Sequence, residues 1–182
     1  MKLKVATDCS GIDAPIVALK RIGWPIEQVF CSDIYQPALE VLAANKADSC
    51  VIFNDITERS PKSLSAFRNL DLYVFSPPCK NYSALTWNKN KEDPHLWQTC
   101  IDVVEYSKPK VCVFENVERF KTANKSKHFS GMLKRINDIG CYEVHHSVLT
   151  AKITVYLRTE NDCLSLAYAK IASSNHFNGP RK

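Results

Sequence analysis

Short apolar runs alternate with amphipathic stretches along most of this 182-residue chain. Five runs have the length and composition of buried strands, at 3–7, 28–32, 51–53, 70–75 and 110–114. Five stretches have helical spacing of apolar residues or the end signals of helices, at 14–22, 37–44, 61–67, 95–107 and 130–139. Because strands that alternate with helices form right-handed crossovers, this pattern predicts an α/β fold with a mostly parallel sheet between two layers of helices.

The C-terminal part of the chain has a different pattern. After Gly140, three strand-like runs follow one another without an intervening helix, at 143–149, 153–157 and 163–169. Strands joined without a crossover helix pair antiparallel, so we expect an antiparallel edge on the sheet. The chain length fits one domain, which we place at residues 1–170, followed by a polar tail at 171–182 that is expected to fray.

The composition excludes several classes of protein. With 45% hydrophobic and 24% charged residues, the chain is neither a disordered tail nor a repeat array. No window approaches the roughly 18 apolar residues of a membrane helix, and Asp8 comes too early for a signal peptide. Eight cysteines occur without a Cys-x-x-Cys pair, which argues against a zinc site and favours reduced thiols. We therefore expect an intracellular protein without a metal or a membrane partner.

The net charge of +5 is concentrated in one part of the chain. Residues 80–135 contain eleven basic and six acidic residues, a difference of five that accounts for the whole excess. The stretch from Arg119 to Arg135 has six bases and no acid. Such a stretch is either a solvated basic face or a binding surface for a polyanion, whose phosphates it would attract in a salt-dependent way.

Three polar clusters follow the first three predicted strands. They are Cys9–Asp13, Ser32–Ile34 and Asn54–Ile56. Each alone is consistent with a tight turn or a helix cap. In an open parallel sheet, however, ligands bind beyond the carboxyl ends of the strands, and an acid at the end of the second strand commonly accepts ribose hydroxyls. Together the clusters predict a nucleoside-type pocket without a glycine-rich phosphate loop.

The fourth and fifth predicted strands are followed by residues with catalytic chemistry. Pro77 and Pro78 brace the chain directly before Cys79, as a nucleophile requires, and Lys80 would lower the pKa of the thiol. Glu115, placed after an apolar strand, could have a raised pKa and act as an acid. Taken alone, Glu115 could equally be a cap or a salt-bridge partner.

These segments resemble the motifs of the DNA (cytosine-5)-methyltransferase family, in the family's order, across residues 3 to about 151. Cys9–Asp13 is similar to the first motif, Phe-x-Gly-x-Gly, with Cys9 in place of the phenylalanine and Asp13 in place of the second glycine. Pro77-Pro78-Cys79 with Tyr82-Ser83 is similar to the nucleophile loop, and Glu115-Asn116-Val117 to the Glu-Asn-Val motif. The brevity of the chain resembles the short forms of large DNA viruses such as iridoviruses.

The resemblance implies a Rossmann-like fold and methyl transfer from S-adenosylmethionine to carbon 5 of a cytosine flipped out of double-stranded DNA. Cys79 would be the nucleophile, Glu115 would bind ring nitrogen N3, and Asn116 would fix the cysteine loop. The implied cofactor-binding residues are Cys9, Ser10, Gly11, Ile12, Asp33, Ile34, Asp55, Ile56 and Pro77. The implied DNA-binding residues are Lys80, Ser83, Arg119, Lys121, Lys125, Lys127 and Arg158.

Some expected family elements have no counterpart in the sequence. The Gln-x-Arg-x-Arg element is not recognisable, with Arg158 as its lone candidate, and we expect no separate target-recognition domain. We therefore consider a partner protein that supplies target recognition. The alternatives are a degenerate module that binds DNA or a partner without chemistry, a tRNA cytosine methyltransferase, and a small-molecule methyltransferase, which the Pro-Pro-Cys loop argues against. The expected location is the nucleus or cytoplasm of a host cell if the source is viral.

Overall fold

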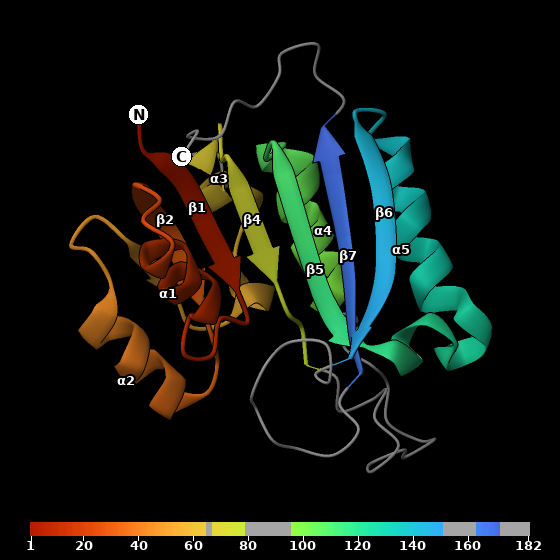
Figure 1. Cartoon of the computed structure of the whole chain (residues 1–182), viewed down its shortest axis with the longest axis horizontal. Helices are drawn as coiled ribbons and strands as arrows, with labels where there is room; N and C mark the ends of the chain where they lie inside the picture. The colour runs from red at the N-terminus through yellow and green to blue at the C-terminus, as the bar shows by residue number, and fades with distance from the viewer. Residues whose placement is uncertain (65–66, 79–95, 151–162, 172–182) are drawn as a thin grey trace.

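The computed structural model describes residues 1–64, 67–78, 96–150 and 163–171, which form one seven-stranded sheet with flanking helices (Figure 1). The strand order across the sheet is β3-β2-β1-β4-β5-β7-β6. The strands are β1 (Leu3–Asp8), β2 (Ile26–Ser32), β3 (Val51–Phe53), β4 (Leu72–Phe75), β5 (Val111–Val117), β6 (Tyr142–Thr150) and β7 (Cys163–Ile171).

The strand directions confirm the predicted architecture. The pairs β2–β3, β1–β2, β1–β4 and β4–β5 are parallel, so the carboxyl ends of five strands meet at one edge of the sheet. Strand β7 inserts between β5 and β6 and pairs antiparallel with both. The predicted antiparallel edge is therefore present, whereas the strand-like run at 153–157 lies outside the described residues.

The helices occupy the predicted crossovers. They are α1 (Ala14–Arg21), α2 (Gln36–Asn45), α3 (Pro61–Leu64), α4 (Leu96–Ser107) and α5 (Lys127–Asp138), with 3-10 turns η1 (Ile56–Glu58), η3 (Glu118–Lys121) and η4 (Ala123–Ser126). Helix α4 lies behind β5 and β7 in Figure 1. Helix α5 packs beside it, and its Arg135 binds Asp102 and Glu105 of α4. No helix in these ranges has both the length and the apolarity needed to cross a membrane.

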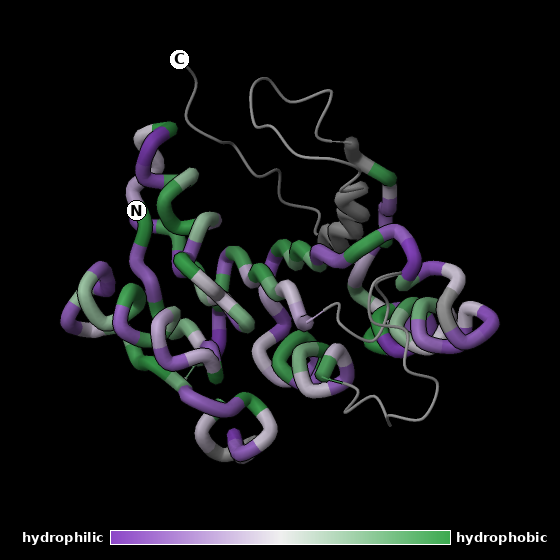
Figure 2. The backbone as a smooth tube through the Cα atoms, turned by 90° about the horizontal axis from the view of Figure 1, so that it is seen from below, coloured by the Kyte–Doolittle hydropathy of each residue, from purple (hydrophilic) through white to green (hydrophobic). Residues whose placement is uncertain are grey.

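Alternation along β2 shows that the sheet is covered on both faces. Phe30 belongs to the large apolar cluster that contains α4, whereas Cys31 packs with Leu42 of α2. Because successive side chains of a strand point to opposite faces, α2 and α4 cover opposite faces of the sheet. The outward side of α5, at the right of Figure 2, is mostly hydrophilic, and its inward side buries Met132 and Ile136.

Strand β5 is longer than predicted. It continues from Phe114 through Val117, so Glu115 and Asn116 lie within the strand and not after it. The expectation that these two residues follow the strand was wrong, because β7 pairs with them, Glu115 opposite Leu166 and Asn116 opposite Ser165. Hydrogen bonds to a strand some fifty residues later in the chain extend β5, and no local apolar pattern signals them.

Candidate active site

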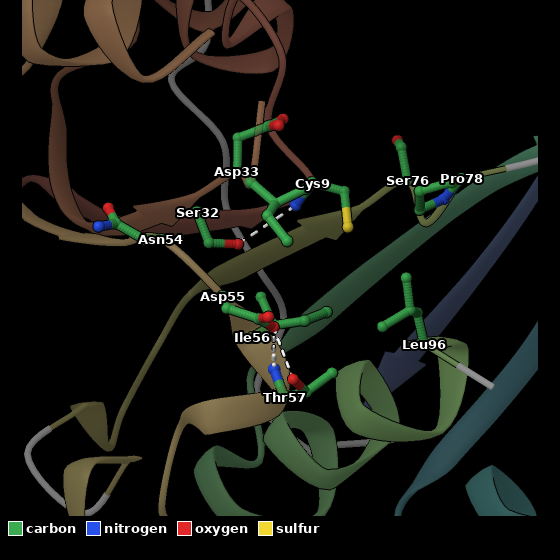
Figure 3. A pocket seen from close by; sticks show the side chains of 11 residues that line it. Cys9, Ser32, Asp33, Asn54, Asp55, Ile56, Thr57, Ser76, Pro78 and Leu96 are labelled. Carbon is green, nitrogen blue, oxygen red and sulfur yellow. Dashed lines mark hydrogen bonds between the residues drawn. The ribbon is translucent and has the colours of Figure 1, made fainter. Parts of the chain in front are cut away.

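A cavity of about 440 Å³ opens at the carboxyl edge of the sheet, where the predicted clusters converge (Figure 3). Five residues of the predicted cofactor set line it: Cys9, Asp33, Ile34, Asp55 and Ile56. Six residues outside that set line it as well: Ser32, Asn54, Thr57, Ser76, Pro78 and Leu96. The turns after β1 and β2, the segment after β3 and the segment after β4 thus form the walls of one pocket.

The turn after β1 is a tight left-handed structure. Cys9, Gly11 and Asp13 have φ angles of 52°, 54° and 60°, a region that favours glycine and that other residues occupy only when their surroundings hold them there. Ser10 is held by β2, because its N–H donates to the Ser32 carbonyl at 2.8 Å. Its hydroxyl in turn accepts from the Ser32 N–H at 3.2 Å. The turn is therefore fastened to the neighbouring strand by backbone and side chain.

Asp13 points into the protein and not into this cavity. Its buried carboxylate accepts hydrogen bonds from the Thr7 hydroxyl at 2.9 Å and from the Gln28 amide. Burial raises the pKa of Asp13, and the two hydrogen bonds oppose that shift. Asp13, the acid in place of the second glycine of the first motif, therefore stabilises the turn after β1. Asp13 and the 68% exposed Ile12 line a separate groove between α1 and α2.

Asp33 and Asp55 supply the carboxylates of the cavity. Asp33 accepts the Gly11 N–H at 2.8 Å through Oδ2 and the Tyr35 N–H at 2.9 Å through Oδ1. Asp55 accepts both the N–H and the hydroxyl of Thr57 through Oδ1, and among the described residues no hydrogen bond occupies its Oδ2. Both side chains are half-buried, so their remaining lone pairs can reach a ligand.

Glu115 lies next to the segment after β4. Burial raises its pKa, and a hydrogen bond from the Ser76 side chain partly offsets the shift. Ser76 itself lines the cavity. A carboxyl group whose protonated form is favoured by desolvation can donate a hydrogen bond to a ring nitrogen.

Asn116 ties β5 to the segment that precedes Cys79. Its side-chain amide is buried and donates a hydrogen bond of 3.0 Å to the Pro77 carbonyl. Its Oδ1 accepts the Val117 N–H at 2.9 Å. Pro77 thus contributes a backbone acceptor, whereas its neighbour Pro78 lines the cavity. Cys79, Lys80, Ser83 and Arg158 lie outside the described residues.

The predicted DNA-binding residues that the structure describes follow β5. Arg119 and Lys121 belong to η3, Lys125 to η4 and Lys127 to the start of α5. These elements lie at the same edge of the sheet as the carboxyl ends of β4 and β5 (Figure 1). The Lys121 ammonium lies 5.8 Å from the centre of the Phe129 ring, so an aromatic surface helps to orient it.

Residues 4–154 match the model of the C-5 cytosine-specific DNA methylase family. The chain belongs to this family. The match covers all five motif segments that carried the resemblance, which is thereby confirmed. S-adenosylmethionine is the methyl donor of the family.

Similar proteins include phage and bacterial enzymes. The chain is 31% identical over 154 residues to "Orphan methyltransferase M.Rho11sI" of Bacillus phage rho11s, covering 83% of this chain and 30% of that protein. It is 30% identical over 123 residues to "Type II methyltransferase M.BbvI" of Brevibacillus brevis, covering 64% of this chain and 33% of that protein. The chain thus spans about a third of the length of these relatives.

Solved structures with the same fold are also longer than this chain. The S. pombe Dnmt2 methyltransferase superposes with a TM-score of 0.68 at 18% identity, covering 97% of this chain and 52% of that one. The Entamoeba histolytica methyltransferase EhMeth superposes with a TM-score of 0.71 at 21% identity, covering 98% and 56%. At this identity the likeness supports the Rossmann-like methyltransferase fold alone.

The cavity suits the family's methyl donor in size and charge. Its volume lies within the roughly 300–1,000 Å³ of small-molecule sites. Among the described lining residues two are acids, Asp33 and Asp55, and none is basic, which suits a ligand with a positively charged sulfonium centre. Asp33 would accept ribose hydroxyls and Asp55 an exocyclic amine.

Two buried residues next to the pocket wall were missed by the sequence analysis. The carboxylate of Asp8 at the end of β1 forms a fully buried ion pair with Arg59, which follows η1, at 2.6 Å. A single signal was available, an acid at the carboxyl end of an apolar strand. Nothing in the sequence indicated that Arg59 is its partner, because the two residues lie 51 positions apart.

Proposed function

We propose that this chain carries the catalytic core of a DNA (cytosine-5)-methyltransferase and methylates carbon 5 of cytosine through a covalent adduct with Cys79. One observation carries the proposal: in a chain that belongs to this family, Glu115, whose pKa burial raises, and Asn116 both bind the segment after β4. Glu115 is hydrogen-bonded to Ser76, which lines the cavity, and Asn116 is bound to the Pro77 carbonyl. A thiol nucleophile two residues after Pro77 would then share one edge of the sheet with an acid and a cofactor pocket.

The roles of the residues follow from the chemistry of cytosine. Carbon 5 is a poor nucleophile, so the Cys79 thiolate adds to carbon 6 and pushes an electron pair into the ring. Protonated Glu115 donates a hydrogen bond to N3 and stabilises the charge that develops there. S-adenosylmethionine, when bound by Asp33 and Asp55, supplies the methyl group. A water molecule then takes the proton from carbon 5, the electron pair of that C–H bond restores the C5–C6 double bond, and the bond between sulfur and carbon 6 breaks to release the Cys79 thiolate.

Asn116 contributes to this chemistry by positioning the nucleophile. Its hydrogen bond to Pro77 holds the chain two residues before the nucleophile, and rigid prolines at 77 and 78 leave little freedom between the two points. Misplacement of a nucleophile by about 1 Å can cost about 10²-fold in rate. Asn116 is therefore a positioning residue for Cys79.

Double-stranded DNA is the proposed substrate. The bases after β5, namely Arg119, Lys121, Lys125 and Lys127, would bind phosphates beside the active site, together with Lys80, Ser83 and Arg158. The target cytosine must leave the stack, because the face of its ring is unreachable within a duplex. A partner protein would supply target recognition. Because the proposed substrate is DNA, the protein would act inside the cell, in the nucleus or cytoplasm of a host cell if the source is viral.

The decisive test is covalent trapping on duplex DNA that contains 5-fluorocytosine, in the presence of S-adenosylmethionine. The fluorine cannot leave as a cation, so the adduct with Cys79 persists and is measured as a denaturation-resistant band. We expect the adduct with the unchanged chain and with the control Cys141→Ser, and its loss in Cys79→Ser. Equally little adduct in all three would refute catalysis on DNA. A parallel assay with transfer RNA tests RNA as the substrate.

A further inference from the structure

Asp8 is the centre of a buried hydrogen-bond network below the cavity. It ends β1, is 1% exposed, and accepts four hydrogen bonds. The Arg59 guanidinium binds both carboxylate oxygens, at 2.8 and 2.6 Å. The Ser32 hydroxyl donates to Oδ1 at 2.7 Å and the Tyr73 hydroxyl to Oδ2 at 2.5 Å. Three neighbouring strands and the segment after β3 thus meet at one carboxylate.

The Arg59 side chain is fixed on its other sides as well. It is fully buried, and its guanidinium lies 5.4 Å from the centre of the Phe30 ring and 5.2 Å from that of Phe53. Its Nε has no hydrogen-bond partner among the described residues, which is a cost for a buried donor. Apolar residues in place of a buried ion pair are often as stable or more so, because the charges lose their hydration. Stability alone is therefore a weak reason for this pair.

The network connects two walls of the cavity. On one side, Ser32 lines the cavity, and its hydroxyl also accepts the Cys9 N–H at 3.3 Å from the turn after β1 (Figure 3). On the other side, Arg59 directly follows η1, where Ile56 and Thr57 line the cavity. Movement of Arg59 away from Asp8 would release both walls at once.

We propose that the Asp8–Arg59 ion pair is a positioning element of the methyl-donor pocket, which holds the turn after β1 and the segment after β3 at a fixed separation. Neither residue lines the cavity in the described part of the chain, so both act through their neighbours, Ser32 on one wall and η1 on the other. The identity of the ligand in this inference rests on the proposed function.

The test separates ligand binding from stability. The dissociation constant of S-adenosylhomocysteine is measured by calorimetry, and the midpoint of unfolding is measured in urea. The two test variants are Arg59→Lys and the triple variant Asp8→Leu/Arg59→Met/Tyr73→Phe, and the midpoint of Arg59→Met alone is measured for comparison. The triple variant replaces the network by apolar groups of similar shape, and Arg59→Lys keeps the charge but loses the paired donors. Arg135→Met is the matched control, because it breaks an ion pair between α4 and α5 instead.

We expect the triple variant to recover the midpoint that Arg59→Met alone loses, and both test variants to bind S-adenosylhomocysteine at least threefold more weakly than the unchanged chain. Arg135→Met should bind as the unchanged chain does. The inference is overturned if either test variant that folds binds less than threefold more weakly, or if neither folds, since the pair would then serve the fold alone. Absence of binding by the unchanged chain would overturn the proposed function together with the inference.

Discussion

The side-chain amide of Asn116 donates a hydrogen bond of 3.0 Å to the Pro77 carbonyl and so joins β5 to the chain just before Cys79. The other end of the same amide accepts the Val117 N–H, so its orientation is set within its own strand. Because Asn116 is 1% exposed, water does not compete for either bond. The backbone at Pro77 is therefore held against the neighbouring strand, two residues before Cys79.

Replacement Asn116→Ala should lower kcat for DNA methylation by about 10²-fold, because the loop before Cys79 loses its tether. Stability should fall by about 1–3 kcal/mol, since the Pro77 carbonyl is left buried and unpaired. Binding of S-adenosylhomocysteine should stay within threefold. Asn45→Ala removes an exposed amide on α2 and serves as the control, with an unchanged rate expected. A normal kcat in Asn116→Ala would contradict the positioning role.

Glu115 should set the alkaline limb of the pH profile of kcat/KM. Its acid form is the active one, so the rate should fall as pH rises through its raised pKa. Ser76→Ala removes a hydrogen bond that favours the carboxylate, which raises the pKa of Glu115 further. The alkaline limb should therefore move to higher pH in Ser76→Ala and stay in place in the control Ser130→Ala, an exposed position on α5. A shift of the acidic limb to higher pH, with the alkaline limb unchanged, would show instead that the carboxylate is the active form.

Replacement of Asp13 should lower the stability of the fold, whereas replacement of Asp33 should weaken binding of S-adenosylhomocysteine. Asp13→Gly keeps a residue suited to the positive φ but removes the acceptor for Thr7 and Gln28, so the free energy of unfolding should fall by about 1–3 kcal/mol. Binding of S-adenosylhomocysteine should change less than threefold.

Asp33→Ala removes the carboxylate that faces the ribose in the proposed complex. The dissociation constant of S-adenosylhomocysteine should rise about 10- to 100-fold, as expected for a hydrogen bond to a charged group. Asp48→Ala, at an exposed acid outside the cavity, is the control. If calorimetry gave equal affinity for Asp33→Ala and the control, the assignment of this pocket to the cofactor would be wrong.

Lys125 and Lys127 are exposed and should bind phosphates. Each alanine variant should reduce the slope of log affinity against log salt concentration by about 1 and weaken binding equally across DNA sequences. Lys2→Ala, at the opposite edge of the sheet, should leave the slope unchanged. These slopes are measured by fluorescence anisotropy titrations at several salt concentrations. Identical slopes for all three variants would exclude the basic stretch from the DNA interface.

The order of strands and helices could be predicted because hydrophobic periodicity is a local property. Runs of a few apolar residues marked β1 to β5, and Gly23 and Gly140 marked the ends of α1 and α5. The clusters at Asp33 and Asp55 could be placed in one pocket from sequence alone, since the carboxyl ends of parallel strands must share an edge. Family motifs then assigned a chemistry to that edge.

The chain pattern thus determined the fold class, the edge that carries the site and the family. Only the tertiary structure decided that β5 continues through Asn116, that Asp13 turns inward to Gln28, and that Asp8 pairs with Arg59. In each case the partner comes from another strand or segment, 51 residues away for Arg59, and no local pattern encodes such a contact. Burial and hydrogen bonding, which set the direction of a polar side chain, exist only once the sheet has assembled.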